Sequence, residues 1–460
     1  MVQAPATTSL LAEYAERFAG SRALHDRSRQ AIPGGITHDG RFLKPFPVYI
    51  RRAQGAYKWD VDDRQLLDYA VGHGSLILGH SDPEVTEAIR RALEHGTHFG
   101  AGHEGEIVWA EQIRSLLPSA ELVRFTAAGT ESTLLAMRVA RAATQKSIIL
   151  KFAGHFHGWN DYALKGESPP FENDAIPGIP SAVLDTVAVV PANDPEALER
   201  RLRQGDIAGV ILEPSGAAWS TVPLDEGFLQ TVRELASRYE AVLIFDEVIT
   251  GFRWSPGGAQ ARFGVTPDLT TLAKIVAGGL PGGAVAGRAE VMRHIAFRDE
   301  PGWNSDRKVR HAGTFNASPV VAAAGTTCLR RCADPMVQQR CDALASRLRT
   351  GLNTILDQRG APGFAWGESS VFHIALGQEC GNRVAGDMRQ PRGISAEELK
   401  RGGGDALATA LELSMLLEGI HLFHSGGFLS VVHTESDIDG TVAAFDRAIA
   451  RLQEDGMFSA

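Results

Sequence analysis

The spacing of hydrophobic positions changes twice along the chain. The pattern before the first change defines an N-terminal segment over residues 1–70. Residues 1–32 carry apolar side chains at helical spacing, and Pro33-Gly34-Gly35 interrupts that pattern. Short apolar runs then predict three strands, over residues 47–50, 56–60 and 66–69. The segment therefore reads as helix followed by a small group of strands.

Residues 71–325 show a different pattern, in which apolar runs alternate with helical stretches. The runs predict strands over 123–126, 147–152, 186–190, 209–213 and 241–246, and the stretches predict helices over 131–145, 195–204 and 226–240. Near-continuous Val, Ile and Leu indicates strands that are buried on both faces. We therefore predict an α/β fold, with a large domain whose mostly parallel sheet is covered by helices.

The pattern changes again at residue 326. Helices are predicted over 337–357, 405–418 and 436–454, with short strands between them. We expect residues 326–460 to form a smaller α+β domain together with the N-terminal segment. A long stretch over 158–182 lacks periodicity, which is typical of a lid or binding loop.

Composition narrows the classes of function. The chain has 460 residues and a formal net charge of −9, which argues against a nucleic-acid or anionic-membrane surface. No apolar run approaches the roughly 20 residues that span a bilayer, and we see no signal peptide. Four cysteines without paired spacing predict no metal site, and low cysteine use predicts a cytoplasmic protein.

Two side chains that could take part in chemistry stand at the ends of apolar runs. Asp246 ends the run Ile244-Phe245-Asp246, and Lys274 has apolar neighbours and a glycine-rich turn at 278–283. A carboxylate at the carboxyl end of a parallel strand faces the crevice where such sheets bind ligands. A desolvated lysine has a depressed pKa, and its neutral amine can attack a carbonyl to form a Schiff base. Taken singly, Asp246 could instead cap a helix or pair with a cation, and Lys274 could be an ordinary surface lysine.

Two further features could hold an anion and a flat ring. A strand runs through Ala128-Gly129-Thr130 directly into a helix, whose N-terminal N–H groups form an anion site, unless Thr130 is simply the N-cap. Phe156 follows another strand and could stack on a planar ligand. His155 and His157 are two residues apart, but no third ligand has metal-binding spacing.

Pyridoxal 5'-phosphate (PLP) accounts for all of these features together. Lys274 would bind its aldehyde, Asp246 would keep its ring nitrogen protonated, and Phe156 would cover the ring. Its phosphate would lie at the helix N-terminus, against Ala128, Gly129 and Thr130. A protonated pyridine is a better electron sink, and Lys274 could then move a proton as a general acid/base.

These residues make the chain resemble the class III aminotransferases of PLP fold type I, within the branch of glutamate-1-semialdehyde 2,1-aminomutase. The resemblance runs from about residue 30 to the C-terminus. Its markers are Pro33-Gly34-Gly35 with Arg41, Gly129-Thr130-Glu131, Phe156-His157-Gly158, Glu213-Pro214, Asp246-Glu247-Val248, Lys274 and Gly313-Thr314-Phe315-Asn316. It implies that His157 and Glu213 support the cofactor, that Val248 packs behind the ring, and that Thr314 reaches the phosphate of the partner in a homodimer.

The substrate is less well defined by the sequence. Arg41 lies where the resemblance implies an arginine that holds the substrate carboxylate, although a surface ion pair would also explain it. The Thr37-His38-Asp39 version of this motif resembles transaminases that act on aromatic amino acids.

We interpret the protein as a PLP-dependent aminotransferase that moves an amino group from a small-molecule amino donor to an oxo-acid acceptor. The alternative is an intramolecular aminomutase of the glutamate-1-semialdehyde type. A PLP-binding regulator without turnover is disfavoured, because Lys274 and Asp246 are both present and no DNA-binding module is attached. A hydrolase of the α/β type is excluded, because the chain has no G-x-S-x-G nucleophile motif.

Overall fold

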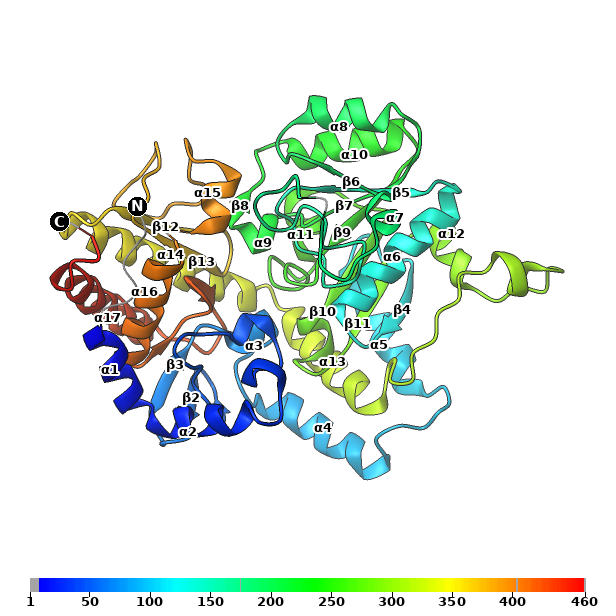
Figure 1. The fold of residues 1–460 in the computed structure, drawn as a ribbon. Helices are drawn as coiled ribbons and strands as arrows, with labels where there is room; N and C mark the ends of the chain where they lie inside the picture. The colour runs from blue at the N-terminus through cyan, green and yellow to red at the C-terminus, as the bar shows by residue number, and fades with distance from the viewer. Residues whose placement is uncertain (1–7, 174, 403, 459–460) are drawn as a thin grey trace. The chain divides into compact units, whose positions relative to one another are not determined.

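The computed structural model describes residues 8–173, 175–402 and 404–458, and the chain divides into two compact units (Figure 1). Unit 1 combines residues 1–82 with 339–460, and unit 2 spans 83–338. The sequence analysis set its boundaries after residues 70 and 325. Residues 1–7 of the predicted N-terminal helix lie outside the described residues.

Unit 2 is built on a seven-stranded sheet with the order β4-β11-β10-β9-β7-β5-β6. Its strands are β4 (Leu122–Thr126), β5 (Ile148–Phe152), β6 (Val187–Val190), β7 (Ile207–Leu212), β9 (Val242–Asp246), β10 (Leu269–Ala273) and β11 (Gly283–Gly287). The neighbours from β10 to β6 pair in parallel, and β11 runs antiparallel to both β10 and β4. The predicted α/β fold with a mostly parallel sheet is confirmed.

Helices cover both faces of this sheet. Alternate residues of a strand point to opposite faces, and in β9 both sets pack against helices. Leu243 and Phe245 of β9 pack in one apolar cluster with α8 (Pro195–Leu202) and α10 (Phe228–Arg238). Val242 and Ile244 belong to a second cluster with α6 (Gly129–Thr144) and α12 (Ala289–Met292). Figure 1 shows α8 and α10 together on one side of the strands. Burial on both faces explains the continuous apolar runs that identified the strands.

Unit 2 contains further short or peripheral elements. They are α4 (Pro83–His95), α5 (Glu104–Leu116), α7 (Ser181–Leu184), α9 (Ala217–Ser220), β8 (Val222–Pro223), α11 (Gly258–Phe263), η3 (Lys274–Ala277), η4 (Arg293–Ile295), η5 (Trp303–Arg307) and α13 (Pro319–Cys332). Within the loop predicted over 158–182, the described residues form turns until α7 begins.

The glycine-rich turn after Lys274 lies against helix α13. A Cβ on Gly278 would lie 2.7 Å from the carbonyl oxygen of Ala324, and one on Gly282 would lie 2.8 Å from Cγ1 of Val321. Both glycines therefore allow this turn to pack tightly against helix α13.

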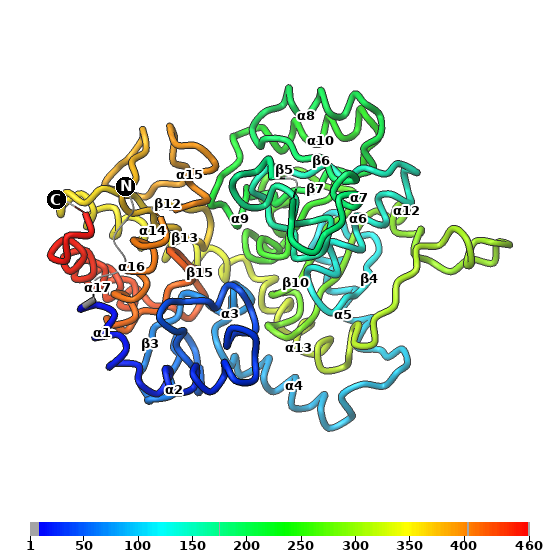
Figure 2. Tube along the Cα trace, viewed as in Figure 1, coloured from blue at the N-terminus to red at the C-terminus, as the bar shows by residue number. Residues whose placement is uncertain are grey.

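Unit 1 contains two small sheets, one with the order β1-β2-β3-β14 and one with the order β12-β13-β15. Its strands are β1 (Ile50–Gln54), β2 (Tyr57–Asp60), β3 (Gln65–Asp68), β12 (Gly363–Trp366), β13 (Val371–Leu376), β14 (Ile420–His421) and β15 (Gly426–Phe428). Because β14 pairs in parallel with β3, the N-terminal and C-terminal segments share one sheet. Figure 2 shows α1 (Thr8–Arg17) of the N-terminal segment beside the C-terminal helix α17 (Glu435–Glu454).

The helices of unit 1 pack around these sheets. They are α1 (Thr8–Arg17), α2 (Ala19–Ser28), η1 (Pro33–Gly35), η2 (Asp39–Arg41), α3 (Val71–Gly74), α14 (Met336–Gln358), α15 (Ala396–Arg401), α16 (Asp405–Leu417) and α17 (Glu435–Glu454); α14 begins in unit 2. Among the described helices, none is both long and apolar enough to cross a membrane.

One predicted strand of unit 1 was wrong. We expected residues 47–50, whereas the first strand is β1 at Ile50–Gln54. Pro47 cannot donate a backbone hydrogen bond, so it is poorly suited to a ladder. Strand β1 is mostly exposed and polar, so it carries no apolar pattern that would reveal it in the sequence. Its antiparallel pairing with β2 defines it.

Candidate active site

Asp246 is the last residue of β9, and Lys274 directly follows the neighbouring strand β10, so both lie where parallel strands of the unit 2 sheet end. The parallel pairing places Asp246 opposite Thr271, three residues before Lys274. Lys274 has a φ of 58°, which turns the chain out of β10 and into η3. Such a left-handed conformation is costly for a residue other than glycine and is concentrated at functional sites. The strand ends therefore bring together the two residues on which the sequence interpretation depends.

The environment of Lys274 makes its side chain a nucleophile near neutral pH. Burial lowers the pKa of its ammonium to about 8, and the positive charge of Arg253 acts in the same direction. The carboxylates of Asp246 and Glu213 oppose this shift but do not cancel it. A substantial neutral fraction of the amine is therefore present at pH 7–8, as attack on a carbonyl requires.

We expect this pKa to be visible in the protein without cofactor. Because only the neutral amine reacts, acylation of Lys274 by a small anhydride should rise with pH and level off above a midpoint near 8. Peptide mass spectrometry across a pH series measures the rate at this position. A midpoint above 10, as for an ordinary lysine, would show that Lys274 is not desolvated.

Asp246 is held by three hydrogen bonds inside the sheet edge. One carboxylate oxygen accepts from the Thr271 hydroxyl and from the Val248 backbone N–H, both at 3.1 Å. The other lies 2.8 Å from Nδ1 of His157. Burial raises the pKa of Asp246 to about 6, against the opposing effects of the Val248 and Thr271 hydrogen bonds and of the Lys274 charge. Asp246 is therefore mostly ionised at pH 7 and above.

His157 donates its ring proton to Asp246. Burial lowers the pKa of His157 well below its ordinary value, so the imidazole is neutral. A neutral imidazole has one N–H, and the hydrogen bond to a carboxylate places that proton on Nδ1. Its Nε2 is buried and has no hydrogen-bond partner among the described residues.

The N-terminus of α6 forms a candidate anion site next to these residues. No described side chain caps this helix, whose N-cap is Ala128. A Cβ on Gly129 would lie 3.1 Å from both methyl groups of Val248 and 3.3 Å from Cβ of Ala273. The first helical turn is thus packed against the neighbours of Asp246 and Lys274, and its dipole favours an anion there.

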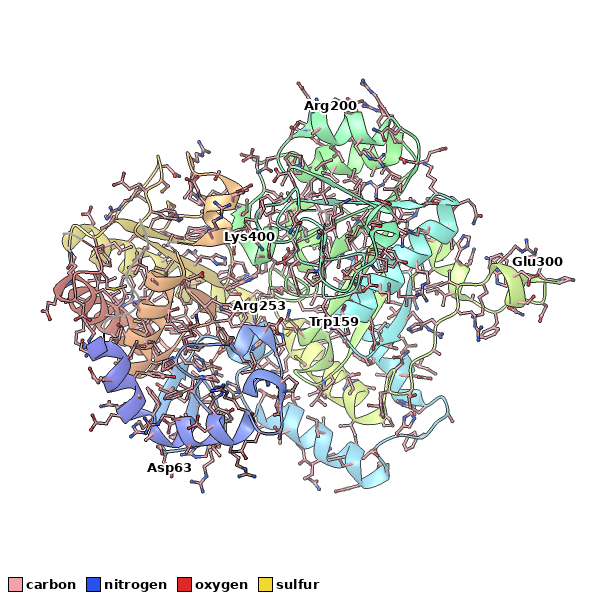
Figure 3. The ribbon with its side chains drawn as sticks, viewed as in Figure 1. Asp63, Trp159, Arg200, Arg253, Glu300 and Lys400 are labelled. Atoms are coloured by element: carbon pink, nitrogen blue, oxygen red, sulfur yellow. The ribbon has the colours of Figure 1, made fainter. Side chains whose placement is uncertain are left out.

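The segment that carries Phe156 and His157 packs onto the same helical turn. The Trp159 N–H donates to the Thr130 hydroxyl at 3.2 Å, and the Thr133 hydroxyl donates to the His157 carbonyl at 2.7 Å. The Phe156 ring is 46% exposed, and Trp159, labelled in Figure 3, is 74% exposed. Phe156 therefore presents an accessible aromatic face, as stacking on a ligand requires.

Gly158 allows this close packing, and we expect its replacement to weaken anion binding. It has a φ of 88°, and a Cβ there would lie 2.6 Å from the Thr130 hydroxyl oxygen. We expect Gly158→Ala to lower the affinity for PLP by about tenfold or more, since Thr130 would be displaced. Gly178→Ala is the control: its φ is 83°, but a Cβ there meets nothing within 4 Å. Equal losses in both variants, measured by equilibrium dialysis, would assign the effect to backbone strain alone.

Glu213 supports the same region from the end of β7. Its buried carboxylate accepts backbone N–H groups from Phe156 at 2.8 Å, Ala218 at 2.8 Å and Trp219 at 2.9 Å. Ala218 and Trp219 have φ values of 48° and 51°, so the carboxylate stabilises a left-handed turn. Burial raises the pKa of Glu213 to about 7, and the charge of Asp246 adds to this rise. Glu213 therefore fixes the position of Phe156.

The residues present at this edge fit PLP. The uncapped helix N-terminus suits its phosphate, the Asp246 carboxylate suits a protonated ring nitrogen, and the Lys274 amine suits its aldehyde. The described residues contain no group of three His, Cys, Asp or Glu that could hold a metal ion. When bound, PLP supplies an electron sink for bond breaking at the carbon that carries an amino group.

Thr314 and Arg41 are the remaining residues that the sequence analysis selected. Thr314 is exposed in a turn before α13. Arg41 belongs to unit 1, where its guanidinium donates to the Thr37 hydroxyl at 2.8 Å and lines a cavity of about 440 Å³ with His73 and His424. The roles of Thr314 and Arg41 remain predictions.

The sequence analysis missed three residues that act on the Asp246–Lys274 pair. Thr271 donates to Asp246, the charge of Arg253 acts on Lys274, and the charge of Lys151 acts on Asp246. Lys151 could have been found, because it places a charged side chain inside a strand that is otherwise apolar. Thr271 stands next to Thr270 in β10, which the sequence analysis did not predict as a strand. Arg253 carries no comparable signal in the sequence.

Comparison with known proteins assigns the family. The fold and the residues at the sheet edge define a PLP-dependent enzyme of fold type I. The family model for class III aminotransferases matches residues 41–363, and the chain belongs to this family. Glutamate-1-semialdehyde 2,1-aminomutase of Sorangium cellulosum is 37% identical, over 95% of this chain and 97% of its own. Four further relatives with that name are 36–44% identical.

Solved structures confirm the fold type and the cofactor. An omega-transaminase from Sphaerobacter thermophilus is 34% identical, with a TM-score of 0.83 over 95% of this chain and 99% of its own. A transaminase with PLP bound is 30% identical, with a TM-score of 0.85 over 96% and 99%. The protein is thus a PLP enzyme. The names of the sequence relatives favour the aminomutase alternative over the aminotransferase interpretation.

Proposed function

We propose that this protein is an aminomutase, which moves an amino group between adjacent carbons of one substrate of the glutamate-1-semialdehyde class. The observation that carries the proposal is the similarity to aminomutases at 36–44% identity, which in four of the five relatives extends over more than nine tenths of both chains. The site supports it, because Lys274 combines a reactive amine with a position beside Asp246.

In this proposal each residue has one task. Lys274, with a pKa of about 8, takes a proton from one of the two substrate carbons and returns a proton to the other. Asp246 holds negative charge at the ring nitrogen of the cofactor, and His157 orients that carboxylate through its 2.8 Å hydrogen bond. Arg41 binds the carboxylate of the substrate.

The test incubates the protein with bound PLP and with glutamate 1-semialdehyde as the only amino compound in the solution. An aminomutase converts this compound to its isomeric amino ketone without any oxo acid or second amine. Chromatography and mass spectrometry measure that product. Conversion that occurs only when a separate oxo acid and amino donor are supplied would reject the proposal.

An aminotransferase is the second candidate, and the similarity to an omega-transaminase at 34% identity favours it. The same residues would then transfer the amino group from a small-molecule donor to an oxo acid. Incubation of an isotopically labelled amino donor with pyruvate or 2-oxoglutarate separates the two candidates, because only a transferase moves the label to the acceptor.

Removal of Arg41 should weaken binding of carboxylate substrates in either reaction. We expect Arg41→Ala to raise the KM of a carboxylate-bearing substrate by about tenfold to a hundredfold, since an arginine–carboxylate pair has two charge-assisted hydrogen bonds. The KM of an amine without a carboxylate should not change. Arg51→Ala is the matched control, because this exposed arginine pairs with Asp63 at 3.1 Å. Equal effects on both substrates would remove Arg41 from the site.

We also propose that the protein acts as a homodimer in which Thr314 contributes to the phosphate site of the partner. Thr314 is exposed within unit 2, and the neighbouring Phe315 ring is 66% exposed. Sedimentation measurements test the dimer. A monomer with undiminished PLP affinity would contradict this assignment of Thr314.

A further inference from the structure

Lys151 is a buried lysine on β5, the strand next to the edge strand β6 of the unit 2 sheet. It lies between Leu150 and Phe152 on β5, opposite Val189 of β6 and Ile211 of β7. Only 1% of its surface is exposed. A buried ammonium is costly unless it is hydrogen-bonded and compensated by charge. A buried charged side chain in a strand that is otherwise apolar therefore calls for a role.

The ammonium of Lys151 holds the segment that follows Phe156. Its Nζ donates to the carbonyl oxygen of Ala163, which is itself buried. The Ala163 N–H donates to the Asn160 carbonyl at 2.8 Å, and the Asn160 amide donates to the Thr133 hydroxyl at 3.2 Å. Because Thr133 also binds the His157 carbonyl, these bonds connect Lys151 to the segment that carries Phe156 and His157.

The charge of Lys151 also acts on the pair of side chains at the ring nitrogen site. It lowers the pKa of Asp246 and that of His157. Both effects favour the same arrangement, with an ionised carboxylate that accepts a proton from a neutral imidazole.

Other charged groups face this pair as well. Lys274 lowers the pKa of Asp246, Glu213 and Asp246 repel each other, and Glu167 raises the pKa of His157. Of the two lysines, Lys274 would bond to the aldehyde of the cofactor. Lys151 lies on β5 and takes no part in that bond, so its positive charge stays the same when PLP binds.

We propose that Lys151 is a positioning residue of the PLP site: its ammonium anchors the 156–163 segment through Ala163, and its buried charge acts on the Asp246–His157 pair that this segment completes. The proposal depends on PLP binding and not on whether the reaction is amino transfer or internal exchange. Its failure is therefore distinguishable from failure of the proposed function.

Three variants separate the two roles of Lys151. Lys151→Met removes both the hydrogen-bond donor and the charge, whereas Lys151→Gln retains a donor without the charge. Lys165→Met is the matched control. Lys165 belongs to the 158–182 loop, and its ammonium also donates to a backbone carbonyl, that of Leu184, at 3.2 Å. Circular dichroism and thermal unfolding first establish that each variant is folded.

The first measurement is PLP affinity between pH 5.5 and 8.5, by quenching of tryptophan fluorescence. In the unmodified protein, affinity should fall as Asp246 is protonated, near pH 6. Without the nearby positive charge the pKa of Asp246 rises, so we expect this midpoint to move upward by about one unit in both Lys151 variants. At pH 6.5 that shift corresponds to a loss of affinity of several-fold, and Lys165→Met should leave the midpoint unchanged.

The second measurement is hydrogen exchange in the protein without PLP, which does not depend on turnover. Lys151→Met should speed exchange over residues 156–163 by about tenfold, whereas Lys151→Gln should retain most of the protection. An unshifted affinity midpoint in folded Lys151→Gln would overturn the electrostatic role, and unchanged exchange in Lys151→Met would overturn the anchoring role. If Lys151→Met does not fold, Lys151→Gln tests both roles. Its affinity midpoint decides the electrostatic role. Because glutamine retains a hydrogen-bond donor, tenfold faster exchange over residues 156–163 of this variant would reject the anchoring role.

Discussion

Replacement of Lys274 by alanine should reduce turnover by roughly 10⁴-fold or more, since it removes both the amine that bonds to PLP and the group that moves the proton. The visible absorbance of the covalently attached cofactor should disappear. PLP should still bind without the covalent bond, because the helix N-terminus at Gly129 and the carboxylate of Asp246 are unchanged. Absorbance spectra, dialysis and steady-state kinetics measure the three effects separately.

Lys146→Ala provides the control for this result. Lys146 also belongs to unit 2, and its ammonium binds the carbonyl oxygens of Tyr239 at 3.0 Å and Glu240 at 3.2 Å. Its replacement removes an ammonium group and its two hydrogen bonds but no group beside Asp246. Full turnover or an unchanged visible band in Lys274→Ala would refute the role of Lys274.

The elements of unit 2 were the most predictable from the sequence. Strands β5, β7 and β9 are buried on both faces, so their apolar runs are continuous and unambiguous. By contrast, β11 consists of Gly283–Gly287, with glycine at both ends and two alanines and one valine between. Its sequence is a weak strand signal, and its pairing with β10 and β4 defines it instead. The sequence analysis did not identify it.

The candidate site was predictable where chemistry depends on residue type. Asp246 and Lys274 stand out because charged groups at the ends of apolar strands are unusual. The hydrogen bond from His157 to Asp246 was not predictable, since it joins a loop after β5 to the end of β9. The three N–H groups on Glu213 likewise depend on the left-handed turn at Ala218 and Trp219, for which the sequence carries no clear signal.

Replacement of Asp246 by asparagine should have the second-largest effect, and its main cause is electrostatic. Asparagine keeps the shape of the side chain and an oxygen that can accept from Thr271 and Val248. It removes the negative charge that keeps the ring nitrogen of PLP protonated, together with the second oxygen, which accepts from His157. We expect kcat to fall by roughly 10²–10⁴-fold while PLP remains bound, because the electron sink is weakened at the reacting carbon.

Asp268→Asn is the matched control for this charge. Asp268 is also a buried carboxylate beside β10, and it accepts from the Leu243 N–H at 2.8 Å and pairs with Arg233 at 2.9 Å. Its replacement should lower the free energy of unfolding and leave kcat of the folded protein unchanged. Steady-state kinetics with PLP at saturation distinguish the two variants. Similar losses of kcat in both would mean that Asp246 acts through stability, and an unchanged kcat in Asp246→Asn would show that its charge does not reach the cofactor.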